Sequence, residues 1–226
     1  MSHFYNIDVG KMKLGSVGIA KAYLGSTLVF QNGSGPTPTP GRLPSGYTEL
    51  EYISNGSNAW IDTGISGVAA WTVSAKIDAS RSASQVIIGR GTSTPIWFGA
   101  YTNKTVWGMG SSQNSSTSAL NKTTSVVSFS GKTASAVVGT NDSCSRTFSA
   151  NGTGNYTLFN VGTNKAYPFV GNLYGDVICV QNNVETFHGV PCTDPNNVAG
   201  LYDLISDTFF GSANATPLTA GPAIPI

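Results

Sequence analysis

Glu49 and Glu51 are the two residues whose type and spacing come nearest to a catalytic pair. A glycosidase needs two carboxylates that flank the scissile bond. Residues two apart on a strand share one face, with Cα atoms about 6.6 Å apart, so the spacing permits such a pair. We expect the pair to lie in the opening strand of a domain, and we interpret both side chains as solvated carboxylates of an edge strand.

Nucleophilic and metal-dependent chemistry has little support. No Gly-x-Ser-x-Gly occurs, and the two histidines, His3 and His188, stand far apart in the sequence. Two histidines cannot form a His-rich zinc site. We therefore predict no enzyme activity and no cofactor. Calcium stays open because aspartates occur among carbonyl-rich loops without a local ligand pattern: Asp62, Asp142, Asp176, Asp203 and Asp207.

The cysteines do not fix the redox compartment. Cys144, Cys179 and Cys192 are odd in number and contain no Cys-x-x-Cys. Cys179 lies in an apolar run, which favours a buried free thiol. A bridge between Cys179 and Cys192 stays open.

Aromatic and amide side chains offer better chemistry for binding sugars, which pack on aromatic faces and hydrogen-bond to amides and hydroxyls. Three aromatic residues cluster in a segment that we expect to form a hairpin turning at Asn103–Lys104. By alternation Trp97 and Tyr101 share a face, and two interpretations stay open: packing inside the sheet or a surface platform. The candidate carbohydrate-binding residues are Trp97, Tyr101, Trp107, Asn103, Asn141 and Asp142.

The composition excludes several partners. Charged residues make up 10% of the chain, and its net charge is +1 with no basic run, so we expect no nucleic acid. No apolar run approaches the roughly 20 residues of a membrane-spanning helix, and the first residues lack the pattern of a signal peptide. We expect the chain to act in a cytoplasm or to leave a cell inside an assembled particle.

Short alternating segments separated by turn residues predict an all-β protein. One helical turn is expected near residues 200–204. The predicted strands of the body are Glu49–Ile53, Trp60–Asp62, Trp71–Ile77, Gln85–Gly89, Ile96–Tyr101, Thr105–Met109, Ser125–Ser130, Ala134–Val138, Tyr156–Val161, Gly171–Gln181 and Glu185–Gly189.

Residues 32–41 are rich in Gly, Pro and Thr, and this composition predicts a stiff extended spacer that divides the chain into three regions. The spacer separates an N-terminal arm, residues 1–31, from a body, residues 42–226. In the arm, Val17 to Tyr23 reads as a strand, Gly25–Ser26 as a turn, and Leu28–Phe30 as a returning strand. A hairpin of this length is marginal alone, so we expect the arm to pack against another protein or other copies.

The segment Ile19–Phe30 resembles a short N-terminal module of accessory proteins in tailed-bacteriophage virions. The resemblance implies a virion-anchoring element. The attachment residues would be Ile19, Tyr23, Leu24, Gly25, Val29 and Phe30.

The ends of the body resemble the LamG-like, concanavalin A-like jelly-roll domains of gut bacteriophage virion proteins. The residues that carry the resemblance are Leu43–Ile53 and Ile61–Gly64 at the start, and Gly171–Tyr174, Val190–Cys192, Gly200–Leu204, Phe209–Phe210 and Ala220–Pro222 at the end. It implies a two-sheet jelly-roll sandwich. Laminarinase-like members of this class carry Glu-x-Asp-x-x-Glu on one strand, whereas here Ser54 stands in place of the last acid.

Read on their own, the motifs have structural meanings. Asp62 and Gly64 would end a strand through a local hydrogen bond and a positive φ. Pro191 would lie at a strand end, and Leu201 and Tyr202 would pack where the chain returns over an open sheet edge.

The leading hypothesis is a bacteriophage virion accessory protein, a fibre or decoration subunit at the virion surface. Its arm would contact capsid or tail proteins, and its jelly roll would bind glycan on the host cell. Many copies on one virion would strengthen weak individual contacts. A homo-oligomer such as a trimer fits the arm's need for a partner. A purely structural decoration protein and, less favoured, a polysaccharide-degrading enzyme are the alternatives.

Overall fold

The computed structural model divides the chain into two units, residues 1–42 and Leu43–Pro225. It describes residues 41–77, 84–91, 96–101, 104–109, 112–115, 120–139, 142–148, 152–161 and 167–225, together with short strands of the first unit. The proposed spacer at 32–41 lies almost wholly outside the described residues.

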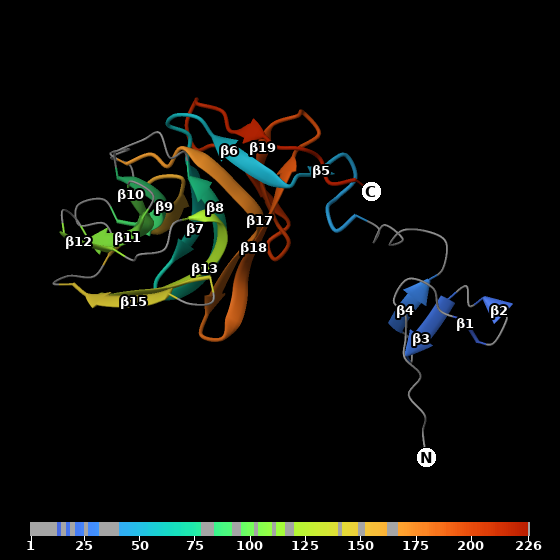
Figure 1. Cartoon of the computed structure of the whole chain (residues 1–226). Coiled ribbons are helices and arrows are strands. Elements are labelled where there is room, and N and C mark those ends of the chain that lie inside the picture. Colours follow the sequence, from blue (N-terminus) through green and yellow to red (C-terminus); the bar gives the residue numbers. More distant parts are fainter. Residues whose placement is uncertain are drawn as a thin grey trace, which may run out of the picture. The chain divides into compact units, whose positions relative to one another are not determined.

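The first unit contains two hairpins (Figure 1). Strands β1 (Lys13–Leu14) and β2 (Val17–Gly18) form one, and β3 (Lys21–Leu24) and β4 (Thr27–Gln31) form the other. Leu24 pairs with Thr27, so the predicted returning strand is confirmed, whereas the predicted turn at Gly25–Ser26 lies outside the described residues. The single strand predicted from Val17 to Tyr23 is wrong, because its two ends pair in different hairpins.

The proposed attachment residues are placed only in part. Tyr23 and Leu24 lie in β3, and Val29 and Phe30 in β4. Ile19 and Gly25 lie outside the described residues. In the register, Ala22 pairs with Phe30 and Tyr23 with Leu28, which leaves Val29 as the extra residue of a bulge.

The second unit is a sandwich of two antiparallel sheets, which confirms the predicted all-β jelly roll (Figure 1). The smaller sheet has the order β12 (Ser112–Ser115), β11 (Lys104–Met109), β10 (Ile96–Tyr101), β9 (Gln85–Arg90), β16 (Asn155–Leu158) and β7 (Ile61–Ser66). Among the described residues, no helix is long and apolar enough to cross a membrane.

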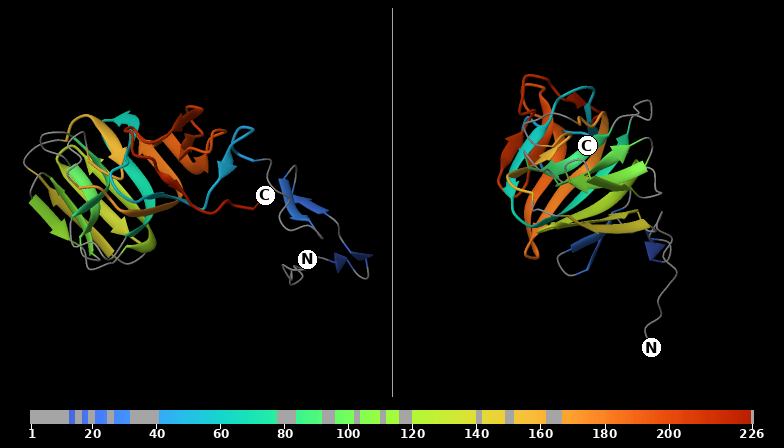
Figure 2. Two further views of the ribbon diagram at one scale, coloured as in Figure 1. Left: turned by 90° about the horizontal axis from the view of Figure 1, so that it is seen from above. Right: turned by 90° about the vertical axis from the view of Figure 1, so that its left-hand side faces the viewer.

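The larger sheet carries the site discussed below. Its main path is β15 (Asp142–Thr147), β14 (Thr133–Val138), β13 (Asn121–Ser130), β8 (Ala69–Ile77), β17 (Gly171–Gln181), β18 (Val184–Thr193), β19 (Ala199–Asp203) and β20 (Thr208–Phe210). Three short strands extend it: β5 (Thr48–Glu49) pairs with β18, β6 (Tyr52–Asn55) with β17, and β21 (Thr219–Ala220) with β6. Figure 2 shows the long β17–β18 hairpin, in orange, beside β8, in teal.

One apolar core lies between the sheets. Along β8, every second residue from Ala69 to Ile77 is buried, as expected for a strand with one face on the core. Trp71 is fully buried, with its ring centroid 5.2 Å from that of Tyr156 and 5.7 Å from that of Phe187. This face fixes the register of β8, so its other face, which we call the outer face of the large sheet, points away from the core.

Several local predictions need correction. Residues Ala199–Asp203 form strand β19 rather than a helical turn, and all five are buried. Leu201 and Tyr202 do pack, but in a strand paired on both sides, with β18 and β20. Pro191 lies inside β18 and not at its end. Its carbonyl accepts a hydrogen bond from the Leu50 amide. The neighbouring strand β5 is only two residues long, so the N–H group that proline lacks removes little from the pairing.

The Asp62–Gly64 motif forms the predicted local hydrogen bond, but it does not end the strand. The Gly64 amide donates to Asp62 Oδ1 at 2.9 Å, and Gly64 has a φ of 70°. Strand β7 nevertheless continues to Ser66, because the motif forms an irregularity in the pairing with β16 rather than a strand end.

Candidate functional site

The predicted carbohydrate residues whose side chains the structure describes, Trp97, Tyr101 and Asp142, do not form one surface. Trp97 is 3% exposed, packs with Val86, Val106 and Val161, and lies 6.5 Å from the ring of Tyr167. The platform interpretation is therefore wrong for Trp97, and the packing interpretation holds. Its neighbour Phe98 lies in the main core, so the predicted alternation along β10 is confirmed.

The remaining candidates lie in three different strands or outside the described residues. Tyr101 ends β10 with 42% of its surface exposed and pairs with Lys104, which confirms the hairpin, although Lys104 lies in β11 and not in a turn. Trp107 lies in β11, opposite Phe98. Asp142 is half-buried in β15 of the other sheet, in a strand that we expected to be a loop. Asn103 and Asn141 lie outside the described residues.

A different cluster forms on the outer face of the large sheet, and its first element is a bulge at Lys122. The pairing of β13 with β8 shifts between Asn121 and Thr123, and Lys122 has a φ of 60°. A positive φ at a residue other than glycine is strained by about 1 kcal/mol or more, and such strain concentrates at functional sites. A bulge also re-aims the side chain that it carries.

A second bulge lies directly across β8. The pairing of β17 with β8 shifts between Tyr174 and Ile178, and Gly175 takes a φ of 58° that glycine adopts without strain. Ser74 of β8 pairs with Thr124 on one side and with Tyr174 on the other. Both strands that flank β8 are therefore distorted near the level of Ser74.

The two bulges border a hollow of about 340 Å³, which we call the Tyr174 hollow. Lys122 Nζ contacts Glu51 Oε1 at 2.6 Å and lies 4.5 Å from the centre of the Tyr174 ring. Tyr174 is held from two sides, because Tyr52 lies 4.9 Å from its ring and Asn172 donates to its hydroxyl. The lining residues are Glu51, Ser74, Lys122, Thr124, Tyr174, Gly175 and Ile224.

The charges in this hollow compensate one another. The hydrogen bond to Glu51 raises the pKa of Lys122, so the ammonium group stays charged throughout the neutral range. Both side chains are about half exposed, and exposed ion pairs add little to stability. Stability therefore does not account for a strained backbone at Lys122, and strain of this kind concentrates at functional sites.

The same contacts correct the prediction for the two glutamates. The predicted strand Glu49–Ile53 is broken, with β5 ending at Glu49 and β6 beginning at Tyr52. Glu51 lies between them, and its carboxylate pairs with Lys122. The two residues therefore do not form the one-strand pair that the spacing permitted.

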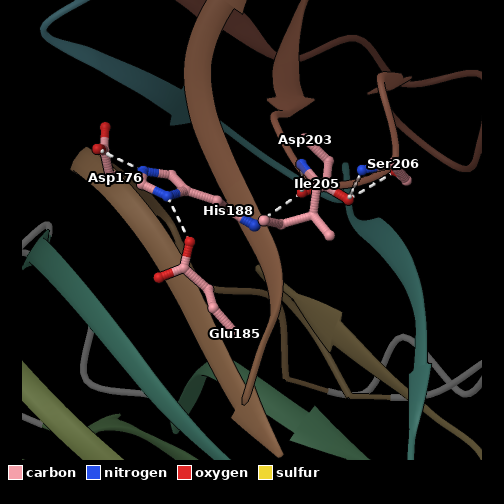
Figure 3. Close-up of polar contacts among 6 residues, drawn as sticks. All are labelled: Asp176, Glu185, His188, Asp203, Ile205 and Ser206. Atoms are coloured by element: carbon pink, nitrogen blue, oxygen red, sulfur yellow. Dashed lines mark hydrogen bonds and ion pairs between the residues drawn. The ribbon is translucent and has the colours of Figure 1, made fainter.

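Next along β17, a charged cluster centres on His188 (Figure 3). Its Nε2 lies 2.8 Å from Asp176 Oδ2, and its Nδ1 lies 2.8 Å from Glu185 Oε1. Burial alone would lower the pKa of His188, but the two carboxylates outweigh burial and raise it. Only an imidazolium can donate to both carboxylates at once, so the protonated ring links β17 to β18.

This arrangement predicts that His188 stabilises the body more in acid than in alkali. Because its pKa is higher in the folded chain than the usual value of 6.5, its contribution is complete below that value and disappears as the pH rises through the folded pKa. We expect His188→Gln to lower the urea midpoint more at about pH 6 than at about pH 9. Equal losses at both pH values would contradict the charged clamp.

Two of the cysteines, Cys179 and Cys192, are buried thiols. Cys179 and Cys192 are both free, and burial raises the pKa of Cys179 to about 11 and that of Cys192 to about 12. The bridge left open by the sequence does not form between them. In the part of the chain that the structure describes, no group of three or more His, Cys, Asp and Glu side chains is placed to hold a metal ion.

Sequence reasoning missed Lys122 and Tyr174 as partners. They lie 52 positions apart, and only a bulge turns Lys122 toward the tyrosine. The one usable signal was Gly175 inside a predicted strand, because an interior glycine often marks a bulge.

Comparisons with known proteins place the chain far from characterised relatives. No protein-family model and no curated protein matches it. One similar structure is a candidate carbohydrate-binding protein from Bacteroides ovatus, at 10% identity and a TM-score of 0.49, with 78% of this chain and 62% of that chain covered. Domains LG4-5 of the mouse laminin alpha1 chain align at 10% identity and a TM-score of 0.45, with 79% and 47% covered.

A third structure, Scytalido-glutamic peptidase with a peptide-based transition-state analogue, aligns at 13% identity and a TM-score of 0.30, with 62% of this chain and 82% of that chain covered. The chain thus spans less than two thirds of the first two chains that it resembles. These similarities are too distant to assign a function, which has to be argued from the residues of the site.

Proposed function

We propose that this chain binds a neutral glycan through the Tyr174 hollow. The observation that carries the proposal is the strained bulge that directs Lys122 to the rim of the hollow, between the ring of Tyr174 and the carboxylate of Glu51. A strained residue persists where the surrounding structure holds it, and such positions cluster at binding sites.

The chemistry of the lining fits sugar hydroxyls. Lys122 offers N–H donors, Glu51 offers acceptor oxygens, and the hydroxyls of Ser74 and Thr124 can do both. The aromatic ring of Tyr174 and the side chain of Ile224 supply apolar surface for the C–H face of a sugar. Since Lys122 and Glu51 neutralise one another, a neutral ligand needs no further counter-charge.

We further propose that the first unit attaches the glycan-binding body to a bacteriophage virion, as a fibre or decoration subunit. Support comes from the resemblance of Ile19–Phe30 to virion modules and from the separate clustering of residues 1–42. A two-stranded hairpin is marginally stable alone, which favours a partner, either virion proteins or other copies of this chain. The deciding measurement is whether purified particles contain the chain.

Tyr174→Ala should abolish glycan binding, because it removes the apolar floor of the hollow and the ring that faces Lys122. We expect a loss of at least about ten-fold in affinity, the usual effect of truncating an aromatic anchor. The readout is binding of the purified full chain to a glycan array and to whole host cells, with the melting temperature confirming that the variant is folded.

Tyr101→Ala is the matched control, because Tyr101 is an exposed tyrosine on the other sheet and was itself a sequence-based candidate. It should bind like the unmodified chain. A loss with Tyr101→Ala but not with Tyr174→Ala would move the site to the small sheet. Absence of binding to glycans and cells by the unmodified chain would favour the purely structural alternative.

A further inference from the structure

Small side chains of β8 run along the middle of the outer face of the large sheet, and we call this row, with its neighbours on β13 and β17, the trough. The outward side chains of β8, those of Ala70, Thr72 and Ser74, are half-buried and alternate with the buried residues of the core face. Each pairs with one residue of β13 and one of β17, and in every row the β8 side chain is no larger than its neighbours. The rows are Ser128–Ala70–Val180, Val126–Thr72–Ile178 and Thr124–Ser74–Tyr174.

A hollow lies at each end of this trough. The Tyr174 hollow includes Ser74, and a second hollow of about 220 Å³ includes Ala70, Ser128 and Val180. The turn Asn182–Asn183 closes the second hollow. Alternate residues of a strand are about 6.8 Å apart, so the rows at Ala70 and Ser74 lie about 14 Å apart, more than one sugar ring covers.

The lining of the trough suits a chain of sugars. Between the hollows its middle row consists of one hydroxyl side chain and two branched aliphatic side chains, those of Thr72, Val126 and Ile178. The second hollow adds the amides of Asn182 and Asn183, and its lining carries no charge. A glycan chain repeats apolar C–H faces and hydroxyl edges along its length, so it can contact both the apolar and the polar side chains of the trough.

We infer that the ligand is an internal stretch of a linear glycan, which lies along β8 and fills both hollows, rather than a single terminal sugar. The inference rests on the proposed glycan-binding function. It adds that affinity depends on ligand length, because a short oligosaccharide reaches one hollow only.

Thr72→Arg tests this geometry, since Thr72 lines neither hollow but lies between them. The probes are linear gluco-, xylo- and manno-oligosaccharides from disaccharide to hexasaccharide, with the corresponding polymers, titrated against the full chain. We expect affinity to rise with length and then level off. Thr72→Arg should lower affinity for the longest members by about ten-fold or more and leave disaccharide affinity unchanged. Thr72→Gln is a milder block if the arginine variant does not fold.

Val137→Arg is the control, because Val137 is exposed on the same face but lies in β14, outside the trough. It should bind all probes like the unmodified chain. If disaccharides bind as tightly as hexasaccharides, or if Thr72 variants retain polymer binding while Tyr174→Ala loses it, the trough is refuted and the Tyr174 hollow stands. If the unmodified chain binds no probe and no arrayed glycan, both proposals fall.

Discussion

Gly99→Ala should unfold the body of this protein or destabilise it by at least about 3 kcal/mol. Gly99 lies in the middle of β10, where a bulge in the pairing with β9 brings the two backbones together. An added Cβ would collide with the carbonyl oxygen of Gln85, and a backbone atom cannot move away as a flexible side chain can. Relief would require separating two central strands of the small sheet.

The measurement is a urea denaturation curve of the full chain followed by near-UV circular dichroism. Gly56→Ala is the matched control, because a Cβ added there meets no atom within 4 Å. It should change the midpoint little. A midpoint for Gly99→Ala that matches that of the control would show that β9 and β10 are not packed in the register described here.

This glycine illustrates what the sequence could predict and what it could not. Alternating burial is readable wherever one face of a strand meets the core, so the strand from Trp71 to Ile77 was placed nearly correctly. The collision at Gly99 depends on a bulge in a neighbouring strand. The interior glycine is the one signal within 96–101, and it does not show which strand approaches it.

Some strands without alternation were missed, for two opposite reasons. Segments such as Ser112–Ser115 contain only polar residues, so they resemble a loop until the register shows them paired at the end of a sheet. Ala199–Asp203 is buried at every position because other residues cover both of its faces, and a strand of this kind shows no period of two. Hydrophobic periodicity carries information only for half-buried strands.

The candidate site was missed because it depends on shifts in register. Lys122 and Tyr174 belong to strands that flank β8, and a bulge in each strand brings the lysine over the ring. A one-residue shift exchanges the two faces of a strand, so the side on which Lys122 lies cannot be read from its own segment. Trp97, the first residue of the aromatic cluster that was conspicuous in the sequence, is part of the packing.

The second large effect is expected at Asp203. This residue belongs to the segment Gly200–Leu204, and the sequence alone did not show what its carboxylate contacts. The carboxylate of Asp203 is 2% exposed and accepts four hydrogen bonds (Figure 3). Its donors are the His188 amide at 2.7 Å, the Ile205 and Ser206 amides at 3.2 Å each, and the Ser206 hydroxyl at 2.6 Å. One side chain thus closes the turn after β19 and ties it to β18.

Asp203→Ala should lower the free energy of unfolding by about 2 kcal/mol, because it removes a nearly fully buried acceptor and leaves its four donors without that partner. Asp203→Asn keeps one acceptor oxygen in the same shape and should lose about half as much. Urea denaturation of both variants at neutral pH measures the difference. If the alanine variant loses no more free energy of unfolding than the asparagine variant, water must replace Asp203 as the acceptor for these donors. Asp203 would then not be the residue that ties the turn after β19 to β18.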